Sequence, residues 1–202
     1  MLRILIVCTG NTCRSPMAHA MLLDLAARSG QAIEVRSAGI STMNGLPASP
    51  HAVTALRKRN LHAPGTSTAL TEHEVAWADL ILTLSTSHKR AIVQQYPEAI
   101  SKTHTLKEYA LRGDRVMDDV AEAERLYSEW QVRQALGQQL SAEEQARLFE
   151  LQRSLPNFDI ADPFGGSLAL YEQCADEIED ALLSVVDKLE DEEGGGDRAR
   201  GE

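Results

Sequence analysis

The feature that most constrains the fold is a short aliphatic run at the start of the chain, Leu2–Val7 (LRILIV). Branched aliphatic residues with little polar alternation are typical of a strand that is buried on both faces of a parallel sheet. A polar loop follows, and Pro16 then stands where a first helical turn would begin, with apolar residues at helical spacing until Gly30. A strand that leads through a loop into a helix predicts an α/β fold.

The same alternation continues along the chain. Further strands are expected at 33–37, 79–84 and 104–109, and further helices at 50–60, 87–95 and 167–189. This order predicts a doubly wound, four-stranded parallel sheet with helices on both faces and right-handed crossovers. At 202 residues, of which 43% are hydrophobic, the chain can bury one good core. Residues 1–190 are therefore expected to form a single domain.

Two segments differ from this alternation. Between Gly113 and Asn157, apolar residues follow a helical stripe that Gly137 interrupts, and a second helix is expected from Ser141, where Glu144 completes a capping box. The sequence predicts a helical hairpin inserted at 113–157, which either packs inertly or selects protein substrates. Residues 191–202 are acidic and Gly-rich, a composition that predicts a disordered tail.

Charge and composition exclude several classes of protein. The net charge of -10 argues against a nucleic-acid partner, because phosphates are neutralised by a basic face. No apolar run approaches the roughly 20 residues of a membrane span, and Met1–Val7 is too short for a signal peptide. A cytoplasmic location without membrane association is therefore expected. Three cysteines without a second Cys or His cluster predict neither a disulfide framework nor a metal, and no cofactor is expected.

The loop after the first predicted strand is the candidate functional site. It runs from Cys8 to Pro16 and reads CTGNTCRSP. In open α/β sheets, ligands bind beyond the carboxyl ends of the strands, and a tight loop before a helix N-terminus points backbone N–H groups inward. The sequence thus predicts a cradle for phosphate and similar anions, lined by Thr9, Gly10, Asn11, Thr12, Cys13 and Ser15.

Two side chains of this loop suggest chemistry. A thiol at the rim of such a cradle is stabilised as a thiolate, which makes Cys8 a candidate nucleophile. Arg14 supplies a planar, permanently charged fork that can hold two phosphate oxygens and stabilise charge in the transition state. Together they favour nucleophilic attack on phosphorus.

A candidate general acid lies much later in the chain. Pro163 disfavours helical geometry at Asp162, and the glycines Gly165 and Gly166 permit a sharp turn, so the carboxyl is presented on a structured loop. A helix-capping aspartate is the alternative. Asp159 is a nearby competitor, but it lacks the proline and the turn. Asp162 is therefore the predicted acid.

The segment Val7–Met17 (VCTGNTCRSPM) closely resembles the signature of the low-molecular-weight protein tyrosine phosphatase family, and the resemblance extends through 35–39, 78–82 and 162–166. It implies that Asp162 protonates the leaving group while Cys8 forms a phosphocysteine, which water then hydrolyses without a metal. By the same resemblance, the residues that brace the loop are Asn11, Ser15 and Ser37.

The residue four positions after the nucleophile bears on the substrate. Tyrosine-directed members usually carry an aliphatic residue there, whereas this chain has Thr12 and so resembles the protein-arginine phosphatases. A small hydroxyl-bearing side chain accommodates a phosphoguanidinium that a bulkier apolar one excludes. The expected substrates are arginine-phosphorylated proteins, with tyrosine-phosphorylated proteins as the alternative.

Two rival functions and one regulatory role were weighed against this interpretation. Thioredoxin-coupled arsenate reductases share the loop but use two further cysteines, and beyond the loop this chain has Cys174 alone. A non-catalytic phosphate-binding module would need neither Arg14 nor Asp162. In this family the counterpart of Cys13 can trap the oxidised nucleophile as a disulfide; a small buried loop residue is the equal alternative.

Overall fold

The structure, a computed structural model, describes residues 1–198. The chain divides into two compact units: residues 1–110 together with the chain from Phe158 onward, and Leu111–Asn157. The first unit contains every strand of the sheet and the predicted phosphate-binding loop, so it carries the candidate site.

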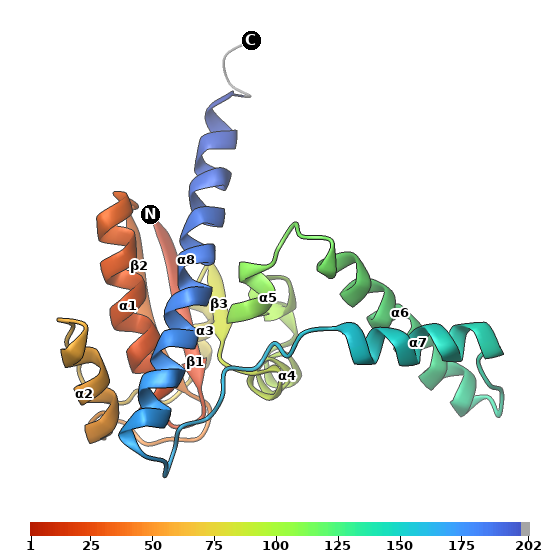
Figure 1. The fold of residues 1–202 in the computed structure, drawn as a ribbon, viewed down its shortest axis with the longest axis horizontal. Coiled ribbons are helices and arrows are strands. Elements are labelled where there is room, and N and C mark those ends of the chain that lie inside the picture. The colour runs from red at the N-terminus through yellow and green to blue at the C-terminus, as the bar shows by residue number, and fades with distance from the viewer. Residues whose placement is uncertain (199–202) are drawn as a thin grey trace. The chain divides into compact units, whose positions relative to one another are not determined.

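The first unit is built on a sheet of four parallel strands in the order β2-β1-β3-β4 (Figure 1). The strands are β1 (Leu2–Cys8), β2 (Ile33–Gly39), β3 (Leu80–Thr83) and β4 (Thr103–Thr105). In the register of the sheet, Ile4 of β1 lies between Val35 of β2 and Leu80 of β3. The predicted doubly wound α/β sheet is confirmed, and its central strand is the run from which the prediction began.

Helices cover both faces of this sheet. Alternate β1 residues, Ile4 and Ile6, pack into a core with α1, α2, α5 and α8, while Leu5 and Val7 pack into a second core with α3, α4 and η1. Burial on both faces explains why β1 reads as a continuous apolar run. The helices on the first face are α1 (Arg14–Ser29), α2 (Pro50–Lys58), α5 (Leu106–Ala110) and α8 (Leu168–Arg198), and on the second α3 (Glu72–Trp77), α4 (Thr86–Gln95) and the 3-10 turn η1 (Pro97–Lys102).

The predicted strand at 104–109 is wrong for most of its length. Only Thr103–Thr105 is a strand, and α5 begins at Leu106. The Thr105 hydroxyl accepts from the Glu108 N–H (3.1 Å), and the Glu108 carboxylate accepts from the Thr105 N–H (2.8 Å). This reciprocal capping box starts a helix within the segment that was predicted to be a strand.

The helix α8 extends to Arg198, and residues 199–202 lie outside the described residues. A disordered tail at 191–202 stays a prediction. Neither α8 nor any other helix within 1–198 has an apolar stretch long enough to span a membrane.

The second unit consists of α6 (Val116–Ala135) and α7 (Ala142–Ser154), which pack against each other. The predicted capping box is confirmed: the Ser141 hydroxyl accepts from the Glu144 N–H, and the Glu144 carboxylate accepts from the Ser141 N–H. Arg147 on α7 forms ion pairs with Asp119 and Glu122 on α6. Charged pairs between the helices therefore supplement a small apolar contact.

Candidate active site

The loop between β1 and α1 is fixed by hydrogen bonds to its neighbours. The carbonyl of Thr9 accepts from the Ser41 N–H (2.9 Å), and the carbonyl of Thr12 accepts from the Ser49 N–H (2.8 Å). Gly39, at the end of β2, lies so close that a Cβ there would sit 2.7 Å from the Thr9 carbonyl oxygen. Gly39 was not predicted as a site residue, and its position at the end of a strand was the available signal.

The thiol of Cys8 receives hydrogen bonds within the loop. Its sulfur lies 3.3 Å from the Asn11 N–H and 3.0 Å from the Ser15 hydroxyl. The Asn11 amide donates to the Ser15 oxygen (2.8 Å), so the Ser15 hydroxyl hydrogen is available for the sulfur. Two hydrogen-bond donors of the loop are therefore directed at the buried sulfur.

Asn11 anchors this arrangement. It adopts φ 51°, a left-handed conformation that asparagine tolerates better than most residues, and it is 2% exposed. Its side-chain oxygen accepts from the Thr68 N–H (2.8 Å) while its amide holds Ser15. The loop is thus tied to a segment far away in the sequence, a connection that the sequence did not reveal.

Ser37 contacts α1, and its predicted role in bracing the loop stays a prediction. Its hydroxyl lies 3.3 Å from His19 Nδ1 on α1, whereas the bracing bonds of the loop join Asn11, Ser15 and Thr68. Burial lowers the pKa of His19 to about 4, so its imidazole is neutral at pH 7. Ser37 therefore contributes to a neighbouring contact between β2 and α1.

Arg14 and Asp162 meet although they are far apart in the sequence. Arg14 Nη2 donates to Asp162 Oδ2 (2.8 Å), and Nη1 donates to the Ile160 carbonyl (3.2 Å). The Arg14 side chain is 6% exposed and that of Asp162 is 51% exposed. The backbone of Ile160 is held in turn by the carbonyl of Leu84, after β3. The structure thus places the predicted acid beside the predicted phosphate clamp.

The loop that carries Asp162 has the sharp turn that its glycines suggested. The Phe164 N–H donates to Asp162 Oδ1 (3.2 Å), and Gly165 has φ 75°. A Cβ at Gly166 would lie 2.6 Å from the Leu170 side chain. Asp159 has another task, because its carboxylate accepts from the N–H and hydroxyl of Thr86 at the start of α4. The geometry favours Asp162 over Asp159 at the cavity.

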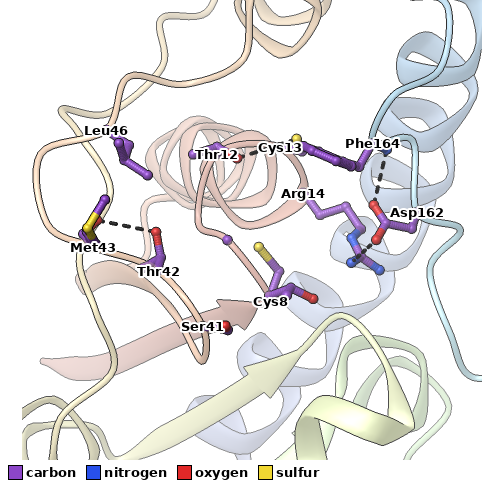
Figure 2. Close-up of a pocket in the computed structure, with 12 residues that line it drawn as sticks. Cys8, Thr12, Cys13, Arg14, Ser41, Thr42, Met43, Leu46, Asp162 and Phe164 are labelled. Carbon is purple, nitrogen blue, oxygen red and sulfur yellow. Dashed lines mark hydrogen bonds and ion pairs between the residues drawn. The ribbon is translucent and has the colours of Figure 1, made fainter.

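These groups surround a cavity of about 620 Å³. Figure 2 shows the Cys8 sulfur and the Arg14 guanidinium between two walls. One wall is the loop after β2, with Thr42, Met43 and Leu46, and the other carries Asp162 and Phe164. The apolar wall residues Met43, Leu46 and Phe164 were not predicted as site residues. The remaining lining residues are Thr9, Gly10, Thr12, Cys13 and Ser41.

Cys13 points away from Cys8 in the close-up view (Figure 2). Its sulfur lies 3.2 Å from the Tyr171 hydroxyl and 3.6 Å from the Thr12 hydroxyl. Burial raises the pKa of Tyr171 to about 12, so this hydroxyl is protonated at pH 7. All three cysteines are free thiols, and a disulfide between Cys8 and Cys13 stays a prediction.

Cys174 is buried on α8. Burial raises the pKa of its thiol to about 12, so it is protonated and a poor nucleophile at neutral pH. Within residues 1–198, no group of three or more His, Cys, Asp or Glu side chains is arranged to hold a metal ion.

A comparison with known proteins identifies the family. The sequence model of the family described as "Low molecular weight phosphotyrosine protein phosphatase" matches residues 3–130. The chain belongs to this family.

Similar members of the low-molecular-weight phosphatase family cover almost the whole chain. The protein-arginine-phosphatase of Geobacillus stearothermophilus is 32% identical over 95% of this chain and 98% of its own, and that of Bacillus subtilis is 33% identical over 92% and 95%. A solved structure of the arginine phosphatase YwlE, a variant with a phosphorylated active-site serine, superimposes with a TM-score of 0.70 at 32% identity, covering 94% of this chain and 96% of that one.

Proposed function

We propose that this protein hydrolyses phosphoarginine on proteins through a phosphocysteine intermediate. The observation that carries the proposal is the convergence of Cys8, Arg14 and Asp162 on one cavity, with Thr12 on its wall. Two of the relatives described above are protein-arginine-phosphatases, which supports the choice of substrate.

In the first step, the Cys8 sulfur attacks phosphorus. The S–P bond forms, the P–N bond breaks, and its electron pair goes to the guanidino nitrogen, which takes a proton from Asp162. Arg14 and the loop N–H groups stabilise the negative charge on the equatorial oxygens. Because the phosphoryl group and Asp162 compete for the same Arg14 fork, substrate binding frees the Asp162 carboxyl for the leaving group.

In the second step, the Asp162 carboxylate accepts a proton from water. The water oxygen attacks phosphorus, the S–P bond breaks, and its electron pair returns to sulfur as the thiolate. The Asn11 N–H and the Ser15 hydroxyl, both aimed at the sulfur, stabilise this leaving thiolate. Inorganic phosphate and arginine are the products.

Thr12 is the proposed selectivity residue. It lines the cavity, and its hydroxyl has only a long contact with the Cys13 sulfur (3.6 Å), so it can turn toward a substrate N–H group. A larger aliphatic residue such as isoleucine at this position would add volume and leave a guanidinium N–H without a partner. After P–N cleavage, the Asp162 carboxylate can pair with the guanidinium that remains.

Tyrosine phosphatase activity is the second candidate. The apolar walls at Met43, Leu46 and Phe164 would suit an aromatic ring as well as the hydrocarbon stem of arginine. Arsenate reduction is disfavoured, since the third cysteine is buried and its thiol is held in the protonated form. A passive phosphate-binding role leaves the pairing of Arg14 with Asp162 unexplained.

The proposed partners are arginine-phosphorylated proteins, and the proposed location is the cytoplasm. A catalytic thiol needs a compartment that keeps cysteines reduced, and all three cysteines here are free. The unit at 111–157 remains a proposed selector of protein substrates. Deleting it and finding unchanged activity on a phosphorylated protein would refute that role.

The test compares phosphate release from phosphoarginine and phosphotyrosine peptides at neutral pH by the wild type, Cys8→Ser and Thr12→Ile. We expect the wild type to prefer phosphoarginine, and Thr12→Ile to shift the ratio of kcat/KM values toward phosphotyrosine by about 100-fold. Thr12→Val separates the loss of the hydroxyl from added volume, and Thr12→Ser retains the hydroxyl as the matched control. Preference of the wild type for phosphotyrosine would make the second candidate correct, and turnover by Cys8→Ser would refute the mechanism.

A further inference from the structure

Thr9, the residue after the proposed nucleophile, is held from two sides. Its carbonyl accepts from the Ser41 N–H (2.9 Å), on the side of β2. Its hydroxyl lies 2.9 Å from His88 Nε2, on the opposite side, where α4 begins. The first turn of the phosphate-binding loop is therefore anchored by hydrogen bonds on both sides. Ser41 follows β2 and His88 lies on α4, and both are far from Thr9 in the sequence.

His88 is itself rigidly placed. It is 3% exposed, and its backbone N–H donates to the Ser85 hydroxyl (3.3 Å), which caps α4. The neighbouring N–H and hydroxyl of Thr86 donate to Asp159, at 2.6 and 2.8 Å. These contacts fix the first turn of the helix, so the imidazole has little freedom to follow Thr9 if the loop moves.

The chemistry of the imidazole fits a tether. Burial is the main cause that lowers the pKa of His88 to about 4, and the nearby Arg14 is the second. The ring is therefore neutral at pH 7, and it forms one hydrogen bond with Thr9 without adding charge to the site. Its Nδ1 is buried without a hydrogen-bond partner among residues 1–198.

A polar cavity of about 350 Å³ adjoins His88, and it shares Thr9, Arg14 and Asp162 with the proposed active site. The start of α4 in this cavity is already occupied by the Asp159 carboxylate. The cavity is therefore not proposed as a second anion site. Its lining forms a continuous polar surface from His88 to the proposed catalytic groups.

We propose that His88 is a positioning residue, which acts through the Thr9 hydroxyl to hold the first turn of the phosphate-binding loop in the geometry that the transition state requires. This inference rests on the proposed phosphatase function and assigns to it a residue outside the loop. Donors of such a loop contribute most when they are aimed at the transition state, so a loosened first turn lowers kcat more than it raises KM.

The experiment is a double-mutant cycle on Thr9→Val and His88→Phe in the full chain. Each single variant is expected to lower kcat about 10-fold with less than a twofold change in KM, and the double variant is expected to be no worse than either single one. His88→Gln places an amide nitrogen near the position of Nε2, and it is expected to recover activity to within about threefold of the wild type. A role in folding alone would not give this pattern of coupling and rescue.

A second readout separates the tether from the choice of substrate. Binding of orthovanadate, which imitates the trigonal transition state, is compared with binding of inorganic phosphate by calorimetry. His88→Phe is expected to weaken vanadate about 10-fold and phosphate less than threefold. Thr103→Val is the matched control, because Thr103 is fully buried and its hydroxyl donates to the Ala99 carbonyl (2.7 Å) outside the site. It is expected to lower stability but to keep the wild-type vanadate affinity.

The inference is overturned if His88→Phe keeps wild-type kcat and vanadate affinity, or if the effects of Thr9→Val and His88→Phe multiply. Vanadate binding does not depend on which phosphoamino acid the enzyme hydrolyses. A failure of arginine specificity, seen as faster release from phosphotyrosine by the wild type, is thus distinguishable from a failure of the tether.

Discussion

The phosphate-binding loop and the helical unit at 111–157 are stabilised in different ways. Cys8, Asn11, Arg14 and Ser15 are each at most 5% exposed, and the side chains of all four have defined hydrogen-bond partners. In the helical unit, the large side chains Val132, Leu136 and Phe149 are 60% exposed or more, and ion pairs of half-exposed groups join the helices. Order in the loop comes from a buried network of polar groups, whereas order in the helical unit comes from local helix formation, a few buried leucines such as Leu126 and Leu151, and surface charge.

Because of this difference, substitutions in the two regions should have different effects. A buried, fully bonded network is costly to disturb, because each group left without a partner loses its hydrogen bonds without regaining water. Exposed ion pairs contribute little, since water and salt screen them. Substitutions in the loop should therefore lower kcat, and substitutions in the helical unit should have small effects on stability.

The largest expected effect comes from a change of the proposed nucleophile. Cys8→Ser should lower kcat by about 10⁴-fold or more, because a hydroxyl is a far weaker nucleophile than a thiolate at neutral pH. Cys174→Ser is the matched control, since it changes a buried cysteine outside the cavity; it should lower the free energy of unfolding by about 1–3 kcal/mol and leave kcat nearly intact. Steady-state kinetics measure kcat, and urea denaturation measures the free energy of unfolding. Equal loss of turnover in both variants would contradict the assignment.

Next comes the proposed general acid. Asp162→Asn should lower kcat by about 10²- to 10³-fold, because the amide neither donates the proton needed by the leaving group nor activates water. Asp159→Asn provides the comparison with the other carboxylate of this segment, which caps the start of α4. It should cost about 1 kcal/mol of stability and less than threefold in kcat. A larger kinetic effect at Asp159 would reverse the two roles.

A third prediction concerns the pH dependence that His88 adds to the stability of the unit with the site; the segment 111–157 contains no histidine. The pKa of His88 falls from 6.5 to about 4 on folding, so between these values the unfolded chain binds more protons and the free energy of unfolding decreases as the pH falls. His19 shifts in the same direction. His88→Gln should remove on the order of 2 kcal/mol of this decrease between pH 7 and pH 4.5. An unchanged pH dependence would contradict the neutral, buried imidazole.

The smallest effect is expected in the helical unit. Arg147→Gln removes the ion pairs of α7 with Asp119 and Glu122. Because the guanidinium is exposed, the melting temperature should fall slightly at low salt, and the difference from the wild type should vanish at 1 M NaCl. Turnover of a phosphoarginine peptide should change less than twofold. A loss of turnover in Arg147→Gln comparable to that of Asp162→Asn would contradict the proposed difference between the two regions.

Local sequence signals were sufficient for much of the site. Cys8, Arg14 and the residues between them lie in one short loop, and the strand before it and the helix after it are strongly patterned. Pro163 and the paired glycines predicted a structured turn at Asp162, which the backbone adopts. The prediction failed where a local capping box began a helix in place of the expected strand, at Thr105 and Glu108.

The sequence by itself determined the parallel α/β sheet and the loop with its proposed nucleophile and clamp, because burial patterns, capping residues and turn residues act over a few neighbouring positions. Only the tertiary structure decided which distant groups reach that loop: Asp162 beside Arg14, Thr68 on Asn11, Tyr171 on Cys13 and His88 on Thr9. Such contacts depend on the order of the strands and the packing of the helices on the sheet. No local sequence pattern predicts which distant residue a side chain will contact.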